Sequence, residues 1–263
     1  PVSHTYNSLG LFSLTVTATD TNGCVWDTTY MVSNQSNPAI GLSTMGYTQG
    51  CAPQTFQFVM SQYANNPPGT YYVWDFGDGS PTITWGYNQP FINDTITHTF
   101  DSTSCYQNNN YFTVQVTAYN TCDYTTATVS NIRIYLPPDP DIELLNDTVC
   151  AGDPVTFYNQ TIPGFGYSCN QIAAYNWNFG DSLSSNNTSS LQTPTHTYTQ
   201  AGTYQIILQA DNGICGVEED TVELVVIEPP HAIIDPDTSE ICINGTINFT
   251  NLSTGTNPDY QWS

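Results

Sequence analysis

Apolar side chains recur at every second position in several segments of this sequence. Phe56, Phe58 and Met60 form one such series, and the same alternation returns over residues 112–118 and 204–210. A period of two with one apolar face predicts a half-buried antiparallel strand. No stretch combines the period of a helix with helix caps. The pattern therefore predicts an all-β chain.

The chain is also self-similar at a period of roughly 90–100 residues, which is typical of a repeat array. Four kinds of marker recur at this period: the histidine of a His-Thr-aromatic triplet, two sets of cysteines, and the tryptophan of a Tyr-x-Trp pattern. The markers are His4, His98 and His196; Cys24, Cys122 and Cys215; Cys51, Cys150 and Cys242; and Trp74, Trp177 and Trp262. Because unrelated residue types agree on one period, the sequence consists of tandem copies of one unit.

Proline-rich stretches separate the copies, and such stretches hold short linkers extended. They lie at Asn37-Pro38, Pro137-Pro138 and Pro229-Pro230. The predicted divisions are 1–37, the second half of a repeat; 38–137 and 138–229, two complete repeats; and 230–263, the first half of a fourth. The chain begins and ends inside β segments, so we expect it to be cut from a longer array. Seven or so short strands per ~95 residues predict an immunoglobulin-like β-sandwich for each repeat.

A signature segment in each complete repeat combines aromatic residues with a glycine turn. The two copies are Tyr72-Val73-Trp74-Asp75-Phe76-Gly77-Asp78-Gly79-Ser80 and Tyr175-Asn176-Trp177-Asn178-Phe179-Gly180-Asp181-Ser182. Side chains two apart on a strand share a face, so we expect Trp74, Phe76, Trp177 and Phe179 in the two cores. Gly77 and Gly79 supply the positive φ values of a tight hairpin.

These segments resemble the signature of the PKD (polycystic kidney disease) domain family, and residues 194–206 match a later block of the same family. The resemblance covers the chain as half, full, full and half repeats. It implies immunoglobulin-like sandwiches that serve as spacers or binding modules of extracellular proteins and rarely as catalysts. Within that family, the chain resembles the cysteine-bearing repeats of very long surface proteins in gliding and related Gram-negative bacteria.

The charge of the chain excludes two classes of partner. It has 23 acidic residues and a single basic one, Arg133, which gives a formal net charge of −22 at pH 7. Neutralising phosphates requires clusters of Lys and Arg, so a nucleic-acid partner is excluded. Adhesion to anionic membranes through basic patches is excluded for the same reason. No apolar run approaches the ~20 residues of a membrane span, so none is expected in this segment.

Two carboxylates, those of Asp75 and Asp78, lie three residues apart beside the glycine turn. Oxygen ligands of this kind suit Ca²⁺, so a weak calcium site is one interpretation. The favoured interpretation is hydrogen bonding within the turn, because the second repeat has Asn178 in place of Asp75. No other cofactor is expected.

The recurring histidines, His4, His98 and His196, have no nucleophile and no acid partner at a fixed spacing beside them. The sequence pattern therefore indicates no catalytic set of nucleophile, base and orienting acid. We expect the histidines to be structural and the chain to be non-catalytic.

A short motif, Asp followed by Ser or Thr and then by an apolar residue or Thr, is more frequent than the composition predicts. It resembles the O-glycan acceptor motif of the same bacterial surface proteins, so we expect O-glycosylation. The alternative is that Asp-Thr is a pair favoured at the start of strands in this repeat. The acceptor residues would be Thr28, Thr95, Ser102, Thr148, Ser182 and Thr221.

The fold constrains the cysteines. In an immunoglobulin-like sandwich the turn between the first two strands and the turn between the last two lie at opposite ends. Cys51 belongs to the first kind and Cys122 to the second, so they should be about 20 Å or more apart, beyond the ~7 Å Cα limit of a disulfide. In a tandem array Cys51 instead faces the junction at which Cys215 of the next repeat lies.

The favoured pairing is therefore Cys51–Cys215 with Cys105–Cys169, which staples consecutive repeats together. A rival pairing, Cys51–Cys105 with Cys169–Cys215, keeps each bond inside one repeat and is also allowed by the topology. Four cysteines would be left for repeats beyond this segment: Cys24, Cys122, Cys150 and Cys242. Disulfides indicate an oxidising compartment.

These features predict a non-catalytic structural and adhesive stalk that forms a rigid surface fibre or filament outside a bacterial cell. Its expected partners are neighbouring repeats of the same chain, further copies in a self-assembled filament, and surface glycans or cell-surface receptors. The alternative is a carbohydrate- or ligand-binding accessory module of a secreted hydrolase.

Overall fold

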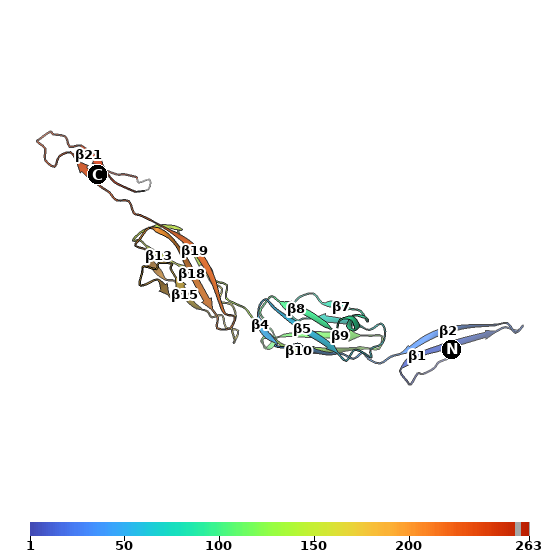
Figure 1. The fold of residues 1–263 in the computed structure, drawn as a ribbon. Coiled ribbons are helices and arrows are strands. Elements are labelled where there is room, and N and C mark those ends of the chain that lie inside the picture. The colour runs from blue at the N-terminus through green and yellow to red at the C-terminus, as the bar shows by residue number, and fades with distance from the viewer. Residues whose placement is uncertain (256–258, 263) are drawn as a thin grey trace. The chain divides into compact units, whose positions relative to one another are not determined.

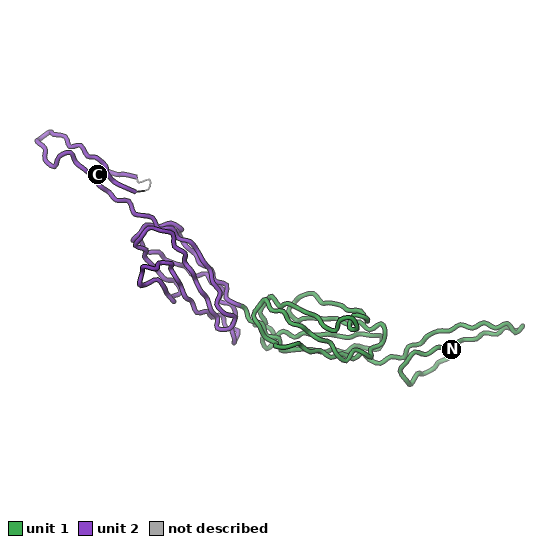
Figure 2. The backbone as a smooth tube through the Cα atoms, viewed as in Figure 1, with its two compact units in different colours: residues 1–136 green, residues 137–263 purple. Residues whose placement is uncertain are grey.

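The computed structural model describes residues 1–255 and 259–262, and this part of the chain is built almost entirely from strands (Figure 1). It divides into two compact units, unit 1 (Pro1–Leu136) and unit 2 (Pro137–Ser263), which Figure 2 shows in different colours. Within the described residues, helix is confined to α1 (Gln89–Ile92) and the 3₁₀ turn η1 (Asn108–Asn110). The prediction of an all-β chain is confirmed.

In unit 1, residues 38–136 form a sandwich of two sheets. The larger sheet contains, in spatial order, β4 (Gln49–Cys51), β10 (Tyr124–Tyr135), β9 (Phe112–Tyr119), β6 (Tyr71–Asp75) and β7 (Ile83–Trp85). The smaller contains β3 (Gly41–Thr44), β5 (Gln54–Ser61) and β8 (Thr95–Phe100). Neighbouring strands are antiparallel except β4 and β10, which run parallel. This is the immunoglobulin-like sandwich that the sequence predicts.

The core of this sandwich follows from the period-two alternation of its strands. On β9, Val114, Val116 and Ala118 are fully buried, and Phe58 on β5 lies in the same apolar cluster. The intervening side chains of β9 face away from the core, as the pleat requires. Burial of one face of each sheet therefore holds the two layers together.

In unit 2, residues 138–229 repeat the plan. The five-stranded sheet contains, in spatial order, β12 (Thr148–Cys150), β19 (Val217–Ile227), β18 (Gly202–Asp211), β15 (Ala174–Asn178) and β16 (Thr188–Ser189). The second layer consists of two short pairs: β11 (Ile142–Glu143) with β14 (Tyr158–Asn159), and β13 (Pro154–Thr156) with β17 (Thr195–Thr197). Side chains from both layers, Phe157 and Leu208 among them, share one buried cluster.

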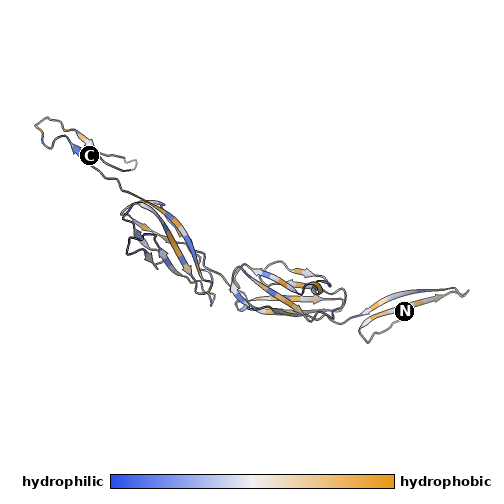
Figure 3. Ribbon diagram, in the orientation of Figure 1, coloured by the Kyte–Doolittle hydropathy of each residue, from blue (hydrophilic) through white to orange (hydrophobic). Residues whose placement is uncertain are grey.

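The segments before residue 38 and after residue 229 form two-stranded sheets. Near the N-terminus, β1 (Gly10–Thr19) pairs with β2 (Val25–Asn34), and near the C-terminus β20 (Ile234–Pro236) pairs with β21 (Phe249–Asn251). Along β1, the apolar residues Phe12, Leu14, Val16 and Ala18 alternate with serine and threonine; Figure 3 colours each residue by its hydropathy. Among the described residues, no helix is long and apolar enough to cross a membrane.

Candidate functional site

The signature strands β6 and β15 present their aromatic side chains to the core of their own sandwich. Trp74 and Trp177 are fully buried, and Phe76 and Phe179 are 1% exposed. Each strand ends directly before Phe76 or Phe179, and the chain then turns out of the sheet. The buried aromatics thus fix the point at which the turn begins.

A glycine at the end of each signature strand occupies a position that other residues would not tolerate. Gly77 has φ +75°, and a Cβ at that position would overlap the backbone carbonyl oxygen of Thr113. Gly180 has φ +70°, and a Cβ there would overlap the carbonyl oxygen of Gln205. Only glycine combines positive φ with so close an approach of two backbones. The following residue, an aspartate in both repeats, is held close to the sandwich.

That aspartate pairs with a histidine from the other layer. In unit 1, His98 Nε2 on β8 lies 2.7 Å from Asp78 Oδ2, and the two side chains are 16% and 9% exposed. Ser80 donates its backbone N–H and its hydroxyl to Asp78 Oδ1, at 3.0 and 2.6 Å. The His98 ring stacks on Phe76 with 3.8 Å between ring centroids. Asp78 is therefore satisfied on both oxygens and ties β8 to the end of β6.

Unit 2 builds the same tie with different surroundings. His196 Nε2 on β17 lies 3.1 Å from Asp181 Oδ2, with side chains 5% and 10% exposed. The His196 ring stacks on Phe179 at 4.6 Å, and Tyr198 packs edge-on against it at 4.7 Å. Tyr198 donates its hydroxyl to the carbonyl oxygen of Phe179 at 2.8 Å. The aromatic-supported Asp–His pair is thus a feature of both complete repeats.

Burial and hydrogen bonding act in opposite directions on the pKa of Asp78. Burial raises the pKa of Asp78, but hydrogen bonds from Ser80 and from His98 lower it by more, so this pKa lies below its ordinary value. An ionised carboxylate only accepts hydrogen bonds, so His98 Nε2 donates to it. In unit 2, burial raises the pKa of Tyr198, and the nearby charge of Asp181 adds to the rise.

Sequence spacing alone did not find these acid partners. No acid recurs at a fixed spacing, as expected, but each of these histidines does have an acid partner: Asp78 precedes His98 by 20 residues and Asp181 precedes His196 by 15. The spacing differs between the repeats, since the loop after the signature is longer in unit 1 and includes β7 and α1. A search for the acid of the signature itself, rather than for a constant interval, would have found both pairs.

The residues of the pair are not arranged for nucleophilic catalysis. In a serine hydrolase the histidine lies between the serine and the acid. Here Asp78 lies between Ser80 and His98, and the Ser80 hydroxyl donates to the carboxylate instead of to an imidazole. The arrangement can orient and stabilise a turn, but the imidazole of His98 contacts Asp78 and not the Ser80 hydroxyl.

Asp75 and Asp78 serve two different local bonds. Asp75 Oδ1 accepts the backbone N–H of Gly77 at 2.9 Å, whereas Asp78 bonds Ser80 and His98. Among the described residues, no group of three or more His, Cys, Asp or Glu side chains is placed to hold a metal ion. The calcium site at these two residues stays a prediction.

The six hydroxyl residues of the Asp-Ser/Thr motif lie at the surface to different degrees. All are exposed except Thr95, which is half-buried. Thr95 and Thr148 are the first residues of β8 and β12, and their hydroxyls bond Asn93 and Asp147. Thr28 and Thr221 lie within strands, and Ser102 and Ser182 lie in loops. The set therefore includes both surface hydroxyls and residues with a local role at strand starts.

Four cysteines are disulfide-bonded: Cys51, Cys105, Cys169 and Cys215. In unit 1, Cys51 lies opposite Tyr135, the last residue of β10. Ser104, the neighbour of Cys105, accepts the N–H of Ile134 on its hydroxyl and donates its own N–H to the Ile134 carbonyl. Both bonded cysteines of unit 1 are therefore at the end from which the chain continues through Pro137-Pro138.

In unit 2 the bonded cysteines lie at the opposite kind of end. Cys215 belongs to the turn between β18 and β19, and its N–H bonds the side chain of Asn212. Cys169 lies in a turn that begins at Gly166, where a Cβ would be 3.2 Å from the Asn212 carbonyl oxygen. The first strand of unit 2, β11, bonds Asp220 near the start of β19. This is the end at which the chain arrives from the linker.

The other four cysteines, Cys24, Cys122, Cys150 and Cys242, are free thiols. Cys122 lies in the turn between β9 and β10, where its Sγ is 3.4 Å from the carbonyl oxygen of Gln35. Cys150 lies opposite Ile227, at the end of unit 2 from which the chain leaves. Each complete repeat thus has one marker cysteine at either end, separated by the length of a twelve-residue strand in unit 1.

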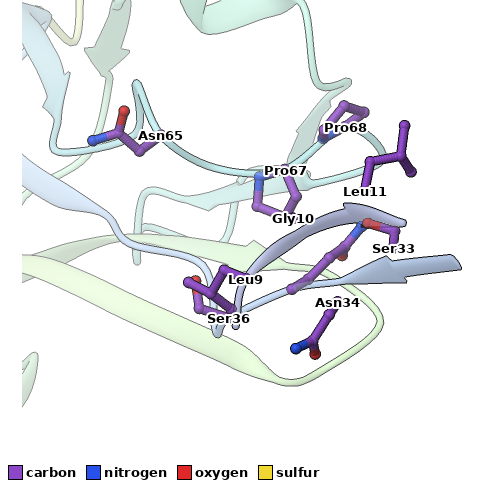
Figure 4. A pocket seen from close by; sticks show the side chains of 10 residues that line it. Leu9, Gly10, Leu11, Ser33, Asn34, Ser36, Asn65, Pro67 and Pro68 are labelled. Atoms are coloured by element: carbon purple, nitrogen blue, oxygen red, sulfur yellow. The ribbon is translucent and has the colours of Figure 1, made fainter. Parts of the chain in front are cut away.

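A hollow of about 570 Å³ in unit 1 lies between the β1–β2 hairpin and the turn at Pro67-Pro68 (Figure 4). Leu9 and Leu11 supply its apolar side chains, and Asn34 and Asn65 its amides. Its lining contains no acid, histidine, cysteine or base. It therefore offers no acid–base or nucleophilic chemistry.

The comparisons with known proteins bear mainly on unit 2 and on the fold. Residues 137–226 match the family model described as PKD domain. Human polycystin-1 is 26% identical over an alignment of 237 residues, and the match covers 80% of this chain and 5% of polycystin-1. The chain therefore spans a small fraction of that relative's length. The family match supports a PKD-type sandwich for the complete repeat of unit 2.

Among solved structures, the PKD domain from human VPS10 domain-containing receptor SorCS2 is 19% identical, and the match covers 52% of this chain and 98% of that domain, with a TM-score of 0.32. The Ig1–Ig3 ectodomain of mouse nectin-like molecule 4 is 14% identical, with 74% of this chain and 65% of that one covered and a TM-score of 0.36.

Proposed function

We propose that this chain is a segment of a non-catalytic structural and adhesive stalk, part of a long extracellular repeat protein at the surface of a bacterium. In this proposal consecutive sandwiches are linked by the disulfides Cys51–Cys215 and Cys105–Cys169. The observation that carries it is that Cys51 and Ser104, the neighbour of Cys105, lie on opposite edges of β10.

The location of the bonded cysteines favours a link across the linker. Cys51 and Cys105 lie at the end of unit 1 from which the chain leaves, and Cys169 and Cys215 lie at the end of unit 2 at which it arrives. Only three residues, Leu136 to Pro138, separate the last strand of one unit from the first bridge of the next, at Asp139. A linker this short keeps the two ends within reach of each other.

The free thiols support the same rule. Cys51 lies in the turn between the first two strands of its repeat, and Cys215 lies in the turn between the last two strands of the next repeat. If cysteines in these two kinds of turn pair between consecutive repeats, Cys51 pairs with Cys215, and both are bonded. The remaining marker cysteines are Cys24, Cys122, Cys150 and Cys242, and each would require a half repeat that this chain does not contain. These are the four thiols that are free. A single pairing rule, applied between each repeat and the next, thus accounts for all six marker cysteines.

The rival pairing fits unit 1 less well. β4, which carries Cys51, bonds one edge of β10, and Ser104 bonds the other edge at Ile134. Two strand spacings of about 4.8 Å put Cys51 roughly 9–10 Å from the residue next to Cys105. A disulfide joins Cα atoms about 4.4–6.8 Å apart. The Cys51–Cys105 bond would therefore have to cross β10.

Staples of this kind would suit a load-bearing spacer. Two covalent links and a proline-rich linker restrict hinge motion between consecutive sandwiches, whereas a single linker leaves relative domain motion as the default. Disulfides persist in oxidising compartments, which agrees with an extracellular location.

Two smaller proposals belong to this function. O-glycans on Thr28, Thr95, Ser102, Thr148, Ser182 and Thr221 would coat the stalk, and intact-mass analysis of native material would show them as mass above that of the bare polypeptide.

A weak calcium site at Asp75 and Asp78 would show as a calcium-dependent rise in the melting temperature that is lost in Asp75→Asn.

The pairing is tested by peptide mapping of the non-reduced chain with its free thiols alkylated. The proposal predicts linked peptides that contain Cys51 with Cys215 and Cys105 with Cys169. In Cys215→Ser, Cys51 should then become alkylated while Cys105 and Cys169 stay linked. Peptides that link Cys51 to Cys105 would overturn the proposal.

A further inference from the structure

We propose that three tyrosines on the outer face of unit 1 bind a neutral glycan. Tyr71 on β6, Tyr119 on β9 and Tyr124 on β10 form a line across the sheet, here called the tyrosine row. The inference deepens the adhesive part of the proposed function, on which it rests, because it names the surface that adheres and the chemical class of its partner.

Strand register places these three side chains next to one another. Tyr71 pairs with Tyr119, and Tyr119 pairs with Tyr124, across three neighbouring strands. Residues directly opposite each other lie on the same face of a sheet. The next residue along β6, Tyr72, is fully buried in the core, so the tyrosine row lies on the opposite, outer face.

The rings of the row pack on one another, and the outer two are open to solvent. The ring centroids of Tyr71 and Tyr119 are 5.1 Å apart with 12° between the ring planes, and those of Tyr119 and Tyr124 are 5.7 Å apart at 36°. Tyr119 is half-buried, whereas Tyr71 and Tyr124 are 44% and 60% exposed. The row is thus a continuous aromatic surface that a ligand can reach from solution.

Hydrogen-bonding side chains adjoin the tyrosine row on the same face. The next outward residue of β9 is Thr117, whose hydroxyl lies 3.1 Å from that of Thr126 and accepts an amide hydrogen of Gln115 at 3.2 Å. Gln115 pairs with Asp75 on one side and Thr128 on the other, and all three are exposed. A ligand that packs on the rings would therefore find amide, hydroxyl and carboxylate groups within the same face.

Unit 2 shows that the fold does not require these tyrosines. Its strands keep the same register, with Ala174, Asp211 and Val217 in the corresponding positions, and a hollow of about 220 Å³ adjoins them. Val217 is 53% exposed although a complete repeat precedes unit 2. We therefore expect this part of the sheet to stay open in unit 1 as well, whatever precedes residue 1.

The chemistry of the tyrosine row fits an uncharged sugar. A tyrosine ring packs on apolar surface while its hydroxyl keeps a polar partner, so tyrosine suits a ligand with both characters. A pyranose ring has C–H groups on its faces and hydroxyl groups around its edge. Of the three tyrosines, Gln115, Thr128 and Asp75, only Asp75 carries a charge at pH 7. An anionic glycan would be repelled by this chain of net charge −22, whereas a neutral one would not.

The dimensions of the surface distinguish a glycan from a protein partner. The outer two of the three strands are ~10 Å apart, and the rise from Tyr71 to Asp75 is ~14 Å. A stable protein–protein interface covers about 800 Å² on each partner, several times the area of this surface. A short segment of a polysaccharide, in contrast, matches it in size.

An array of neutral oligosaccharides, including glucans, mannans and galactans, tests the proposal on the full chain. We expect binding to at least one of them, with an affinity that falls at least tenfold by calorimetry in the triple variant Tyr71→Ala, Tyr119→Asp, Tyr124→Val. Unit 2 has these residues at the same positions, so the fold should tolerate them. The single variant Tyr124→Ala covers the case in which the triple variant does not fold, and it should weaken binding severalfold. The matched control is Tyr47→Ala, at an 86% exposed tyrosine outside the row, which should leave the affinity unchanged.

Two results would overturn the proposal: no binding to any neutral oligosaccharide, or equal affinity of the wild-type chain and the Tyr124→Ala variant. Tighter binding of alginate, an anionic polysaccharide, would overturn the assignment to a neutral partner. Sedimentation of the same samples tests the other occupant, because self-association that is lost in the variants would assign the row to a second copy of the chain. Peptide mapping of Cys51 and Cys215 depends on none of these results, so failure of the glycan site and failure of the stapled stalk are distinguishable.

Discussion

Asp78 and Asp181 tie the two layers of each sandwich together through one side chain. Each follows a strand of the five-stranded sheet and bonds a histidine on a strand of the opposite layer, His98 or His196. Because each carboxylate is at most 10% exposed, its partners replace water. Removal of one partner of such a pair leaves the other polar group buried and unsatisfied.

The first prediction is that Asp78→Asn destabilises unit 1 by about 1.5–3 kcal/mol at pH 7, because it removes a charge-assisted hydrogen bond. Native-state hydrogen exchange of the β5 and β8 amides measures the change. The matched control is Asp75→Asn, which retains an oxygen for the Gly77 N–H and should change stability by less than about 0.5 kcal/mol. Equal effects of the two substitutions would contradict the role given to His98.

The same pair makes stability depend on acid. The pKa of Asp78 is lower in the folded than in the unfolded chain, so its contribution is present above the unfolded pKa, near 4, and is lost as pH falls through the lowered folded value. The difference in stability between the wild-type chain and Asp78→Asn should therefore shrink below about pH 4. A difference that stays constant down to pH 2 would contradict this assignment.

The two turn glycines of unit 1 differ in the space that surrounds them. Gly77 and Gly79 both have positive φ, but only a Cβ at Gly77 would meet a neighbouring backbone. We predict that Gly79→Ala costs about 1–2 kcal/mol from φ alone. Gly77→Ala should cost clearly more, since the carbonyl of Thr113 must also move. Urea unfolding followed by tryptophan fluorescence compares them, and a smaller cost at Gly77 would contradict the close approach.

At the scale of elements, β6 shows how far sequence periodicity reaches. Trp74 is fully buried and Tyr71, on the other face, is 44% exposed and stacks on Tyr119 at 5.1 Å between ring centroids. The alternation predicts this division, as it does for β5, β9 and β18. The parallel pairing of β4 with β10 could not be predicted in the same way, because three residues are too few to show a period.

The prediction at this scale compares the two faces of β6. Trp74→Ala should destabilise unit 1 by about 3–5 kcal/mol through loss of a large core side chain. Tyr71→Ala removes only a cross-strand pair at the surface and should cost about 1 kcal/mol or less. Thermal unfolding of both variants provides the test, and a larger loss in Tyr71→Ala would contradict the orientation of the strand.

At the scale of the whole chain, the repeat determines what could be read from the sequence. Markers such as Cys24, Cys122 and Cys215 revealed the period, and the matching registers of β1–β2 and β18–β19 reproduce it in three dimensions. The Asp–His pairs were not predicted, because the loop between the signature segment and the histidine differs in length between the two repeats. The repeat period was found because it depends on the strands. Both pairings that the sequence leaves open bond the same four cysteines, so the sequence predicts which cysteines are bonded but not how they pair.

The most direct test of the stapled stalk is to pull the oxidised chain from its two termini in a single-molecule force experiment, with the free thiols capped. If Cys51 is bonded to Cys215, load passes through the sulfur atoms, and the stretch between them, on the order of 60 nm of contour length, should extend only after reductant is added. Release of about 22 nm from the segment between Cys105 and Cys169 before reduction would show that each disulfide lies inside one sandwich, and would contradict the account.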